Sequence, residues 1–247
     1  MFTLVGYHKA AVSATLLPAQ PIADPHVTVS GNDLTVPELN QIVAMFCCGG
    51  APTQAQMQSP SLRKLIQEDI PAFIAPEVCT NALSVIVDKR INPLVLDRSE
   101  KLNGLTLHTT DGRIFVWLAD GPISPISGDI RTVKCTTGHT TAADLWQNAA
   151  LTFTQTLPAG RYAVVGMHAH GTALLAARLV FVGYSWRPGV VTGVIAADPA
   201  IPMFRNGQFG VFGEFEFDQP PSIDLLGTGV TSTEEVYLDL IQVRAGR

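Results

Sequence analysis

From residue 81 onward the sequence is a series of short β-rich runs that alternate with turn residues. These runs recur roughly every 10 to 20 residues and are separated by Gly, Pro, Asn or Asp. In the run 151–157, threonine alternates with apolar residues, which is typical of a half-buried strand. Strands at this spacing predict an antiparallel β-sandwich or barrel. We therefore expect a mainly β fold, with two or three short helices mostly in the N-terminal third.

Two of these runs allow more specific predictions. Residues 105–120 contain two β-rich segments joined by Asp111-Gly112, a pair suited to a two-residue turn, and so predict a β-hairpin. Residues 234–245 predict a long final strand with apolar residues on both faces.

Three segments have helical signals. Residues 35–48 begin with a capping-box pattern, Thr35 followed by Glu38, and continue with apolar residues at helical spacing. Residues 59–70 begin at Ser59-Pro60 and end before Pro71. Residues 141–150 form a shorter candidate. We expect the first two helices to pack against a sheet.

The chain shows no internal repeat and no linker long enough to divide it clearly. A soft boundary lies near residue 80, so we expect one structural unit in two parts. Residues 1–80 would form an N-terminal arm with two short helices, and residues 81–247 an antiparallel sandwich. Prolines at 18, 21 and 25 interrupt the apolar N-terminal segment, which predicts a strand plus an arm laid over something else, such as a neighbouring subunit.

Composition argues against several function classes. Charged residues make up 15% of the chain, against about 25% in a typical soluble domain. The net charge is −5 and the basic residues are scattered, so we expect no sequence-specific nucleic-acid binding. The four cysteines (Cys47, Cys48, Cys79 and Cys135) lack zinc-site spacing and predict buried free thiols. No secretory signal or transmembrane helix is expected.

Two histidines, His168 and His170, lie one residue apart in the β-rich run 160–171. On a strand both imidazoles would point to the same face and could reach one cation, as in the cupin arrangement. A cupin motif would place a glutamate about four residues later, and none is present. His108 or His139 could supply a further ligand. The alternative is that the pair marks the polar side of a strand, and we favour it. The sequence thus predicts no metal site, with His168 and His170 as the residues that would form one.

No other pattern carries a convincing chemistry. Ser185 lacks the second glycine of a nucleophile elbow, and the glycines at 207, 210 and 213 lack the residues of a phosphate loop. Glu214 and Glu216 share a strand face, which the charge protection of an edge strand explains. We therefore expect no catalytic residues, no enzyme activity and no cofactor.

The stretches TTDGRIFVWLADG, LPAGRYAVVGMHAHG, NGQFGVFGEFEF and STEEVYLDLIQV resemble the jelly-roll coat proteins of icosahedral viruses and phages. This resemblance implies a capsid subunit that assembles with copies of itself, and possibly with other shell proteins, through sheet edges, loops and an exchanged arm. It implies location in the virion after synthesis in the host cytoplasm; a non-viral chain would be cytoplasmic. The chain lacks the basic arm of many RNA-virus coats, which argues against direct genome packaging.

Apolar residues of the arm and of the last strands are candidate oligomer contacts. They are Leu16, Leu17, Ile22, Phe209, Phe212, Tyr237 and Ile241. Two other functions stay open at this point. One is a cupin-like metal-binding enzyme that uses His168 and His170, and the other is a β-sandwich module that binds a ligand such as a carbohydrate.

Overall fold

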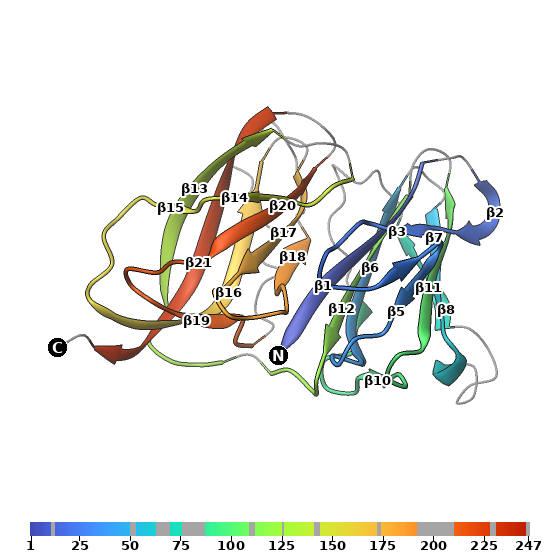
Figure 1. Cartoon of the computed structure of the whole chain (residues 1–247), viewed down its shortest axis with the longest axis horizontal. Helices are drawn as coiled ribbons and strands as arrows, with labels where there is room; N and C mark the ends of the chain where they lie inside the picture. The colour runs from blue at the N-terminus through green and yellow to red at the C-terminus, as the bar shows by residue number, and fades with distance from the viewer. Residues whose placement is uncertain are drawn as a thin grey trace. The chain divides into compact units, whose positions relative to one another are not determined.

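The structure is a computed structural model (Figure 1), in which the chain forms two compact units. It describes residues 1–10, 13–49, 53–62, 70–75, 87–108, 112–124, 126–140, 144–171, 174–191, 210–227 and 231–245. The N-terminal unit comprises Phe2–Pro122, and the C-terminal unit comprises Ile123–Arg247 together with Met1.

The N-terminal unit consists of two antiparallel sheets. Its strands are β1 (Phe2–Lys9), β2 (Ser13–Pro18), β3 (Gln20–Pro21), β4 (Val29–Ser30), β5 (Asp33–Thr35), β6 (Gln41–Gly49), β7 (Thr53–Gln58), β8 (Ile70–Ala75), β9 (Val87–Asp88), β10 (Leu94–Val95), β11 (Lys101–His108) and β12 (Gly112–Ala119). One sheet has the order β10-β6-β12-β1-β3, with β9 also paired to β6. The other has the order β4-β5-β11-β7-β8, with β2 also paired to β11.

Side chains from both sheets form the core of the N-terminal unit. Val5 and Tyr7 of β1 pack in one buried cluster with Met57 of β7 and Leu102 of β11. The Tyr7 hydroxyl donates a hydrogen bond of 2.9 Å to the Leu102 carbonyl oxygen, which links the two sheets directly. A Cβ atom at Gly104 would lie 2.9 Å from Ile114 Cδ1 and 3.2 Å from Tyr7 Cγ, so glycine permits the sheets to approach there.

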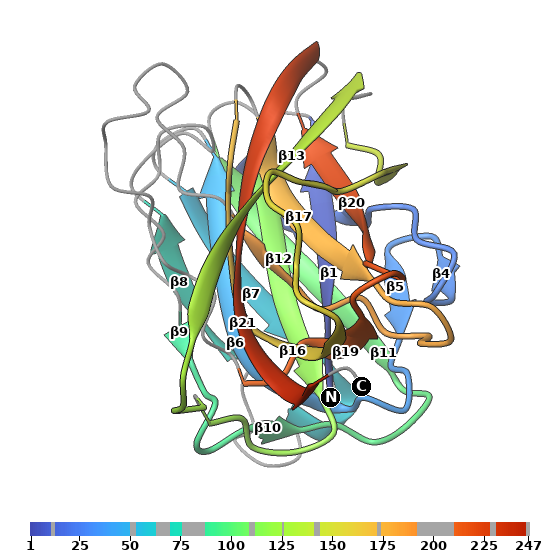
Figure 2. The same ribbon diagram turned by 90° about the vertical axis from the view of Figure 1, so that its left-hand side faces the viewer.

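The C-terminal unit also consists of two antiparallel sheets. Its strands are β13 (Arg131–Thr140), β14 (Gln147–Ala149), β15 (Thr152–Phe153), β16 (Gly160–His170), β17 (Leu174–Val180), β18 (Gly189–Val191), β19 (Gly213–Glu216), β20 (Ser222–Gly227) and β21 (Thr231–Ala245). One sheet has the order β15-β13-β21-β16-β19 and the other β14-β20-β17-β18. Figure 2 shows β13 and β21 side by side along most of their lengths.

One face of the β13–β21–β16 sheet is apolar. Val236, Leu238 and Leu240 alternate along β21 on this face and are buried. At the β19 edge, a Cβ atom at Gly213 would lie 2.6 Å from the Phe181 ring, so the chain that follows β17 packs closely on this sheet. The core of the C-terminal unit therefore lies between its two sheets.

Both units have the same strand connectivity within their described residues. The first strand pairs with the last, β1 with β12 and β13 with β21. The strand before the last lies in the opposite sheet. In the N-terminal unit it is β11, which lies between β2 and β7. In the C-terminal unit it is β20, which lies between β14 and β17. This order is that of a jelly roll. The predicted mainly β, antiparallel sandwich fold is confirmed, and the chain contains it twice.

The helix predicted over residues 35–48 is wrong, because Thr35 ends β5 and residues 41–48 belong to β6. Residues 42–47 are apolar at every position and all are buried, with Met45 paired to Val116 and Cys47 to Ile114. A run that is apolar on both faces fits a buried central strand as well as a helix, and periodicity cannot distinguish the two.

The other two helix predictions also need correction. Residues 60–62 form a helical turn, capped by a 3.3 Å hydrogen bond from the Leu62 N–H to Ser59 Oγ, but Ile70 begins strand β8. Residues 63–69 lie outside the described residues. In the segment 141–150, Asp144 has a φ of 57° and residues 147–149 form β14, so this part is a strand.

The hairpin predicted over residues 105–120 is wrong in its pairing. Both strands form, but β11 pairs with β2, β5 and β7, whereas β12 pairs with β1 and β6 in the other sheet. The strand predicted over 151–157 is reduced to β15 at Thr152–Phe153. The remainder is a loop.

The segment predicted as an arm is folded into the N-terminal unit. β1 lies between β12 and β3, and β2 pairs with β11. The boundary predicted near residue 80 lies outside the described residues. Among the residues that are described, no helix is long and apolar enough to cross a membrane.

Candidate functional site

The polar face of the β13–β21–β16 sheet carries a group of interacting ionisable side chains. The register places Lys134, Tyr237 and His168 side by side in one row across the three strands. The next row contains Thr136, Glu235 and His170. Directly opposed residues of adjacent strands point to the same face, so these side chains can interact.

Glu235 is the centre of this group. Its Oε1 atom accepts a hydrogen bond of 2.5 Å from Lys134 Nζ, and its Oε2 atom lies 3.0 Å from His170 Nε2. The Tyr237 hydroxyl donates a third hydrogen bond of 3.0 Å to Oε2. The hydrogen bond from Lys134, followed by that from His170, lowers the pKa of Glu235 to about 2. The hydrogen bond between Lys134 and Glu235 also raises the pKa of Lys134.

His168 and Asp239 form a second, buried pair on the same face. His168 Nε2 lies 3.4 Å from Asp239 Oδ2, and their side chains are 2% and 1% exposed. Thr132 Oγ1 donates a hydrogen bond of 2.6 Å to Asp239 Oδ1. A Cβ atom at Gly166 would lie 2.7 Å from Asp239 Oδ2, so glycine at 166 leaves room for this carboxylate.

The two histidines share a strand face, as the sequence predicts, but each interacts with its own carboxylate. His168 interacts with Asp239 and His170 with Glu235. Within the described residues, no group of three His, Cys, Asp or Glu side chains is arranged to hold a metal ion. His108 is buried in the N-terminal unit, and the side chain of His139 lies outside the described residues. The two histidines are therefore members of separate hydrogen-bonded pairs.

Sequence reasoning identified the histidines but missed the acidic residues that they contact. Glu235, Tyr237 and Asp239 alternate along β21 with the buried apolar residues of the opposite face. That alternation in the sequence could have shown that these three residues share one face. It could not have shown that β16 lies beside them.

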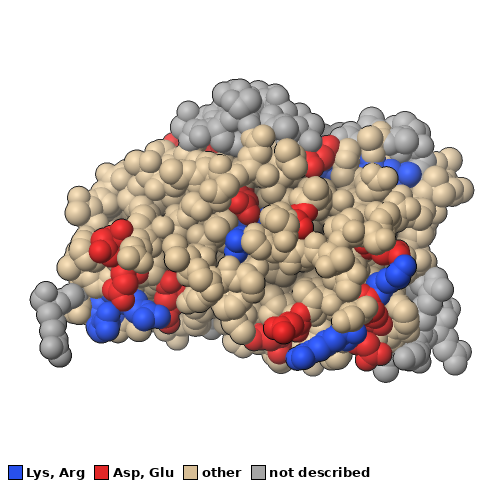
Figure 3. Space-filling view, viewed as in Figure 1, with Lys and Arg blue, Asp and Glu red and all other residues tan. Residues whose placement is uncertain are grey.

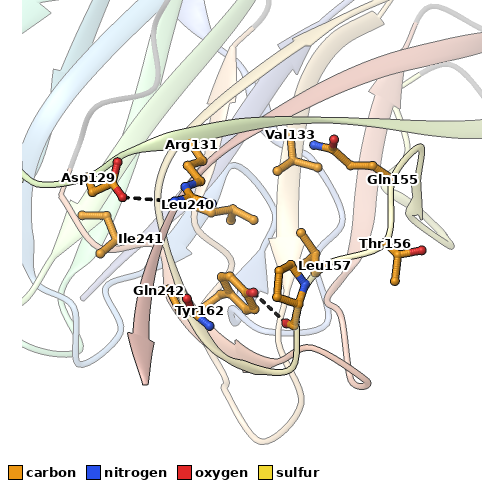
Figure 4. A pocket seen from close by; sticks show the side chains of 11 residues that line it. Asp129, Arg131, Val133, Gln155, Thr156, Leu157, Tyr162, Leu240, Ile241 and Gln242 are labelled. Atoms are coloured by element: carbon orange, nitrogen blue, oxygen red, sulfur yellow. Dashed lines mark hydrogen bonds and ion pairs between the residues drawn. The ribbon is translucent and has the colours of Figure 1, made fainter. Parts of the chain in front are cut away.

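A pocket of about 340 Å³ opens in the C-terminal unit between β13, β21 and the loop that precedes β16 (Figure 4). Buried Val133 and Leu240 contribute apolar lining, together with half-buried Leu157 and Ile241. Exposed polar residues surround them: Asp129, Arg131, Gln155, Thr156 and Gln242. The Tyr162 hydroxyl donates a hydrogen bond of 2.7 Å to the Pro158 carbonyl oxygen, which fixes the loop over the pocket. Pockets of this size that combine an apolar lining with a few polar groups are typical of binding sites.

The polar face of the other sheet of this unit contains a buried ion pair that the sequence did not reveal. Arg178 is fully buried, and its Nη2 atom lies 2.9 Å from Asp224 Oδ2. The Trp146 ring covers the guanidinium, with 3.8 Å between Arg178 Cζ and the ring centroid. Asn148 Nδ2 donates a hydrogen bond of 2.9 Å to Asp224 Oδ1. The Trp146 ring is therefore packed against Arg178 within the C-terminal unit.

The candidate oligomer contacts lie in different environments. Ile22 is buried against Gly6, and Phe212 is 1% exposed, so neither is available at the surface. Leu17 is exposed and Leu16 is half-buried. Tyr237 belongs to the Glu235 group and Ile241 lines the pocket. Phe209 lies outside the described residues.

The described cysteine side chains are inert in character. Cys47 and Cys135 are buried, and neither is in a disulfide. Burial raises the pKa of the Cys135 thiol to about 12, which removes the thiolate needed for reaction near neutral pH.

No family model and no curated protein matches the chain. Among solved structures, the chain is similar to the major capsid protein P2 from bacteriophage PM2. The sequence identity is 11% and the TM-score is 0.29, with 100% of this chain and 99% of that chain covered.

Proposed function

We propose that the chain is a structural subunit that assembles with copies of itself into a shell, as the coat proteins of viruses and phages do. The observation that carries the proposal is the repetition of one jelly-roll connectivity in two units of a single chain. Jelly rolls serve mainly as capsid domains, lectins and cupins. The choice among these three classes rests on how the side chains are used.

The histidines and aromatic residues favour a structural role over the other two classes. A cupin-like enzyme would direct His168 and His170 at a metal ion, yet each lies against a carboxylate. A carbohydrate-binding module would present Trp or Tyr rings to its ligand. Trp117 is buried, Trp146 packs on Arg178, and Trp186 stacks on Tyr184 with ring centroids 4.4 Å apart.

The surface is suited to contact between copies. Figure 3 shows a face that is mostly uncharged, with charged side chains in small groups of mixed sign. The edge strands β4 and β10 carry exposed valines, Val29 and Val95. Natural edge strands are usually protected from pairing by charge, proline or short length, and an exposed valine at one edge of each sheet favours association. A shell subunit would be located in the virion.

The test is the size of the purified chain. Light scattering after gel filtration should detect particles far larger than a 26.4 kDa monomer, and negative-stain microscopy should show closed shells or regular rings. A monomer at all concentrations would contradict the proposal. Deleting residues 1–30 is unsuitable as a test, because it removes β1, β2, β3 and β4 from the sheets of the N-terminal unit.

Point variants test the edges without removing a strand. Val29→Lys and Val95→Lys should each shift the population toward smaller species, because a charge on an edge strand opposes pairing. Ser185→Lys adds the same charge at an exposed loop position and is the matched control. Equal loss of assembly in all three variants would show that charge alone, and not the sheet edge, controls association.

A further inference from the structure

We propose that the pocket of the C-terminal unit binds a small uncharged molecule that has an apolar body and a hydrogen-bonding group at one end (Figure 4). Such a ligand is independent of the proposed assembly, because all the lining residues belong to one unit of one copy. Four properties of the pocket select this class of ligand: its apolar floor, its fixed wall, its size and its balanced charge.

The floor of the pocket is the end of the apolar face that forms the core of this unit. In the β13–β21 register Val133 opposes Leu238, and Leu240 lies two residues further along the same face of β21. Tyr162 adds an aromatic ring, which stacks on Phe215 with ring centroids 5.8 Å apart. An apolar group of a ligand would therefore leave water when it contacts this floor.

Residues 155–158 form a second wall, and hydrogen bonds hold this loop at both ends. At its start, Thr154 Oγ1 donates a hydrogen bond of 2.9 Å to the Lys134 carbonyl oxygen. At its end, the Tyr162 hydroxyl donates the bond of 2.7 Å to the Pro158 carbonyl oxygen. A pocket with a fixed wall requires little ordering of the protein on binding, which favours affinity for a small ligand.

The volume of the pocket limits the size of its ligand. This volume is about 340 Å³. An apolar cavity of about 150 Å³ is large enough to bind benzene. The pocket therefore has room for one ring, or a short aliphatic chain, together with a polar group.

The opening of the pocket carries charges that balance each other. Asp129 and Arg131 line it with opposite charges, and their side chains pair at 3.4 Å. The amides of Gln155 and Gln242 lie among the same lining residues and supply uncharged donors and acceptors. A ligand with a full charge would lose hydration and meet one like and one opposite charge, whereas a hydroxyl or amide group gains hydrogen bonds. The opening therefore favours an uncharged polar end.

Three probes that share one ring test this assignment near neutral pH: benzyl alcohol, benzoate and benzylammonium. Saturation-transfer difference NMR detects their binding whatever the size of the protein particle. We expect benzyl alcohol to bind with a dissociation constant of about 1 mM or below. It should bind about threefold tighter than either charged probe. No saturable binding of benzyl alcohol up to about 10 mM would overturn the inference.

A fourth probe, methyl glucoside, tests the apolar body of the ligand. Its many hydroxyl groups would lose hydration at the apolar floor, so it should bind more weakly than benzyl alcohol. Tighter binding of methyl glucoside would exclude a ligand with an apolar body.

A pocket-filling variant locates the binding. Leu157→Trp enlarges an apolar side chain that lines the pocket and should weaken binding of benzyl alcohol about tenfold or more. Val182→Trp is the matched control, because Val182 is 83% exposed and lies outside the pocket. Equal affinities of the two variants for benzyl alcohol would place the bound probe elsewhere and contradict the assigned site.

Two charge variants test the selectivity of the opening without enlarging any side chain. Asp129→Asn leaves the positive charge and should tighten binding of benzoate about threefold, and Arg131→Gln should do the same for benzylammonium. Unchanged preferences in both variants would refute the role of the balanced pair. Large particles that bind no probe would leave only the shell proposal standing, and a monomer that binds benzyl alcohol would leave only this inference standing.

Discussion

His170 Nε2 lies 3.0 Å from Glu235 Oε2, and the two residues are directly opposed in the β16–β21 pair. Lys134 and Tyr237 bond the same carboxylate, so Glu235 joins three side chains from three adjacent strands. Protonation of the Glu235 carboxylate should therefore lower the stability of this sheet.

The first prediction concerns acid stability. The pKa of Glu235 is lowered to about 2 from an ordinary value of 4.5, chiefly by the hydrogen bond from Lys134. Its stabilising contribution is therefore complete above pH 4.5 and is lost as the pH falls from 4.5 through about 2. Glu235→Gln should remove this pH dependence from the free energy of unfolding. The effect should be about 1 kcal/mol or less, because the pair is partly exposed. Urea unfolding between pH 6 and 2 measures it.

The control for this experiment is Glu216→Gln, which removes the exposed pair with Arg244. A stability profile that changes equally in both variants would contradict a special role for Glu235.

The second prediction concerns the link between the sheets of the N-terminal unit. Tyr7→Phe removes the hydrogen bond to the Leu102 carbonyl oxygen while keeping the ring in the core. Because Tyr7 is fully buried, we expect a loss of about 1–2 kcal/mol in the free energy of unfolding. Tyr184→Phe, at a half-exposed position, is the control and should change stability less. Urea unfolding followed by fluorescence measures both, and equal losses would argue against the inter-sheet bond.

Two strands are placed well by the sequence, and the first of them lies between clear turn residues. The run beginning at Gly160 and ending before Gly171 matches β16, and the run through residues 234–245 matches most of β21. The segment 35–48 failed because it is apolar at consecutive positions, which fits a buried strand and a buried helix equally. Local propensity contains no information that decides between them when both faces are covered.

Pairing was less predictable than the strands themselves. Asp111-Gly112 suggested a hairpin, yet β11 and β12 belong to opposite sheets. In a jelly roll the last strand crosses to pair with the first, and this non-local pairing is set by the whole sheet. The same applies to the candidate site. His168 and His170 could be placed on one face from their spacing, but Glu235 and Asp239 come from a strand 65 or more residues away.

The third prediction tests the space left by Gly166. In Gly166→Ala the new Cβ atom would lie 2.7 Å from Asp239 Oδ2, so the carboxylate must move from His168 and Thr132. We expect a loss of about 1–3 kcal/mol, typical of overpacking a buried site. Gly121→Ala is the control, since no atom lies within 4 Å of its added Cβ. If thermal unfolding shifts the midpoint equally in both variants, the close approach at Gly166 is unimportant.

The last prediction concerns the buried pair of Arg178 and Asp224. Asp224→Asn leaves the guanidinium of Arg178 buried without its carboxylate and should cost about 3–5 kcal/mol. Arg178→Met leaves the opposite charge and should also destabilise the chain. The double variant removes both charges and should be less destabilised than the sum of the single variants, by about 1–3 kcal/mol. Urea unfolding of the three variants completes the cycle. A double variant equal to the sum would mean that the two charges do not stabilise each other.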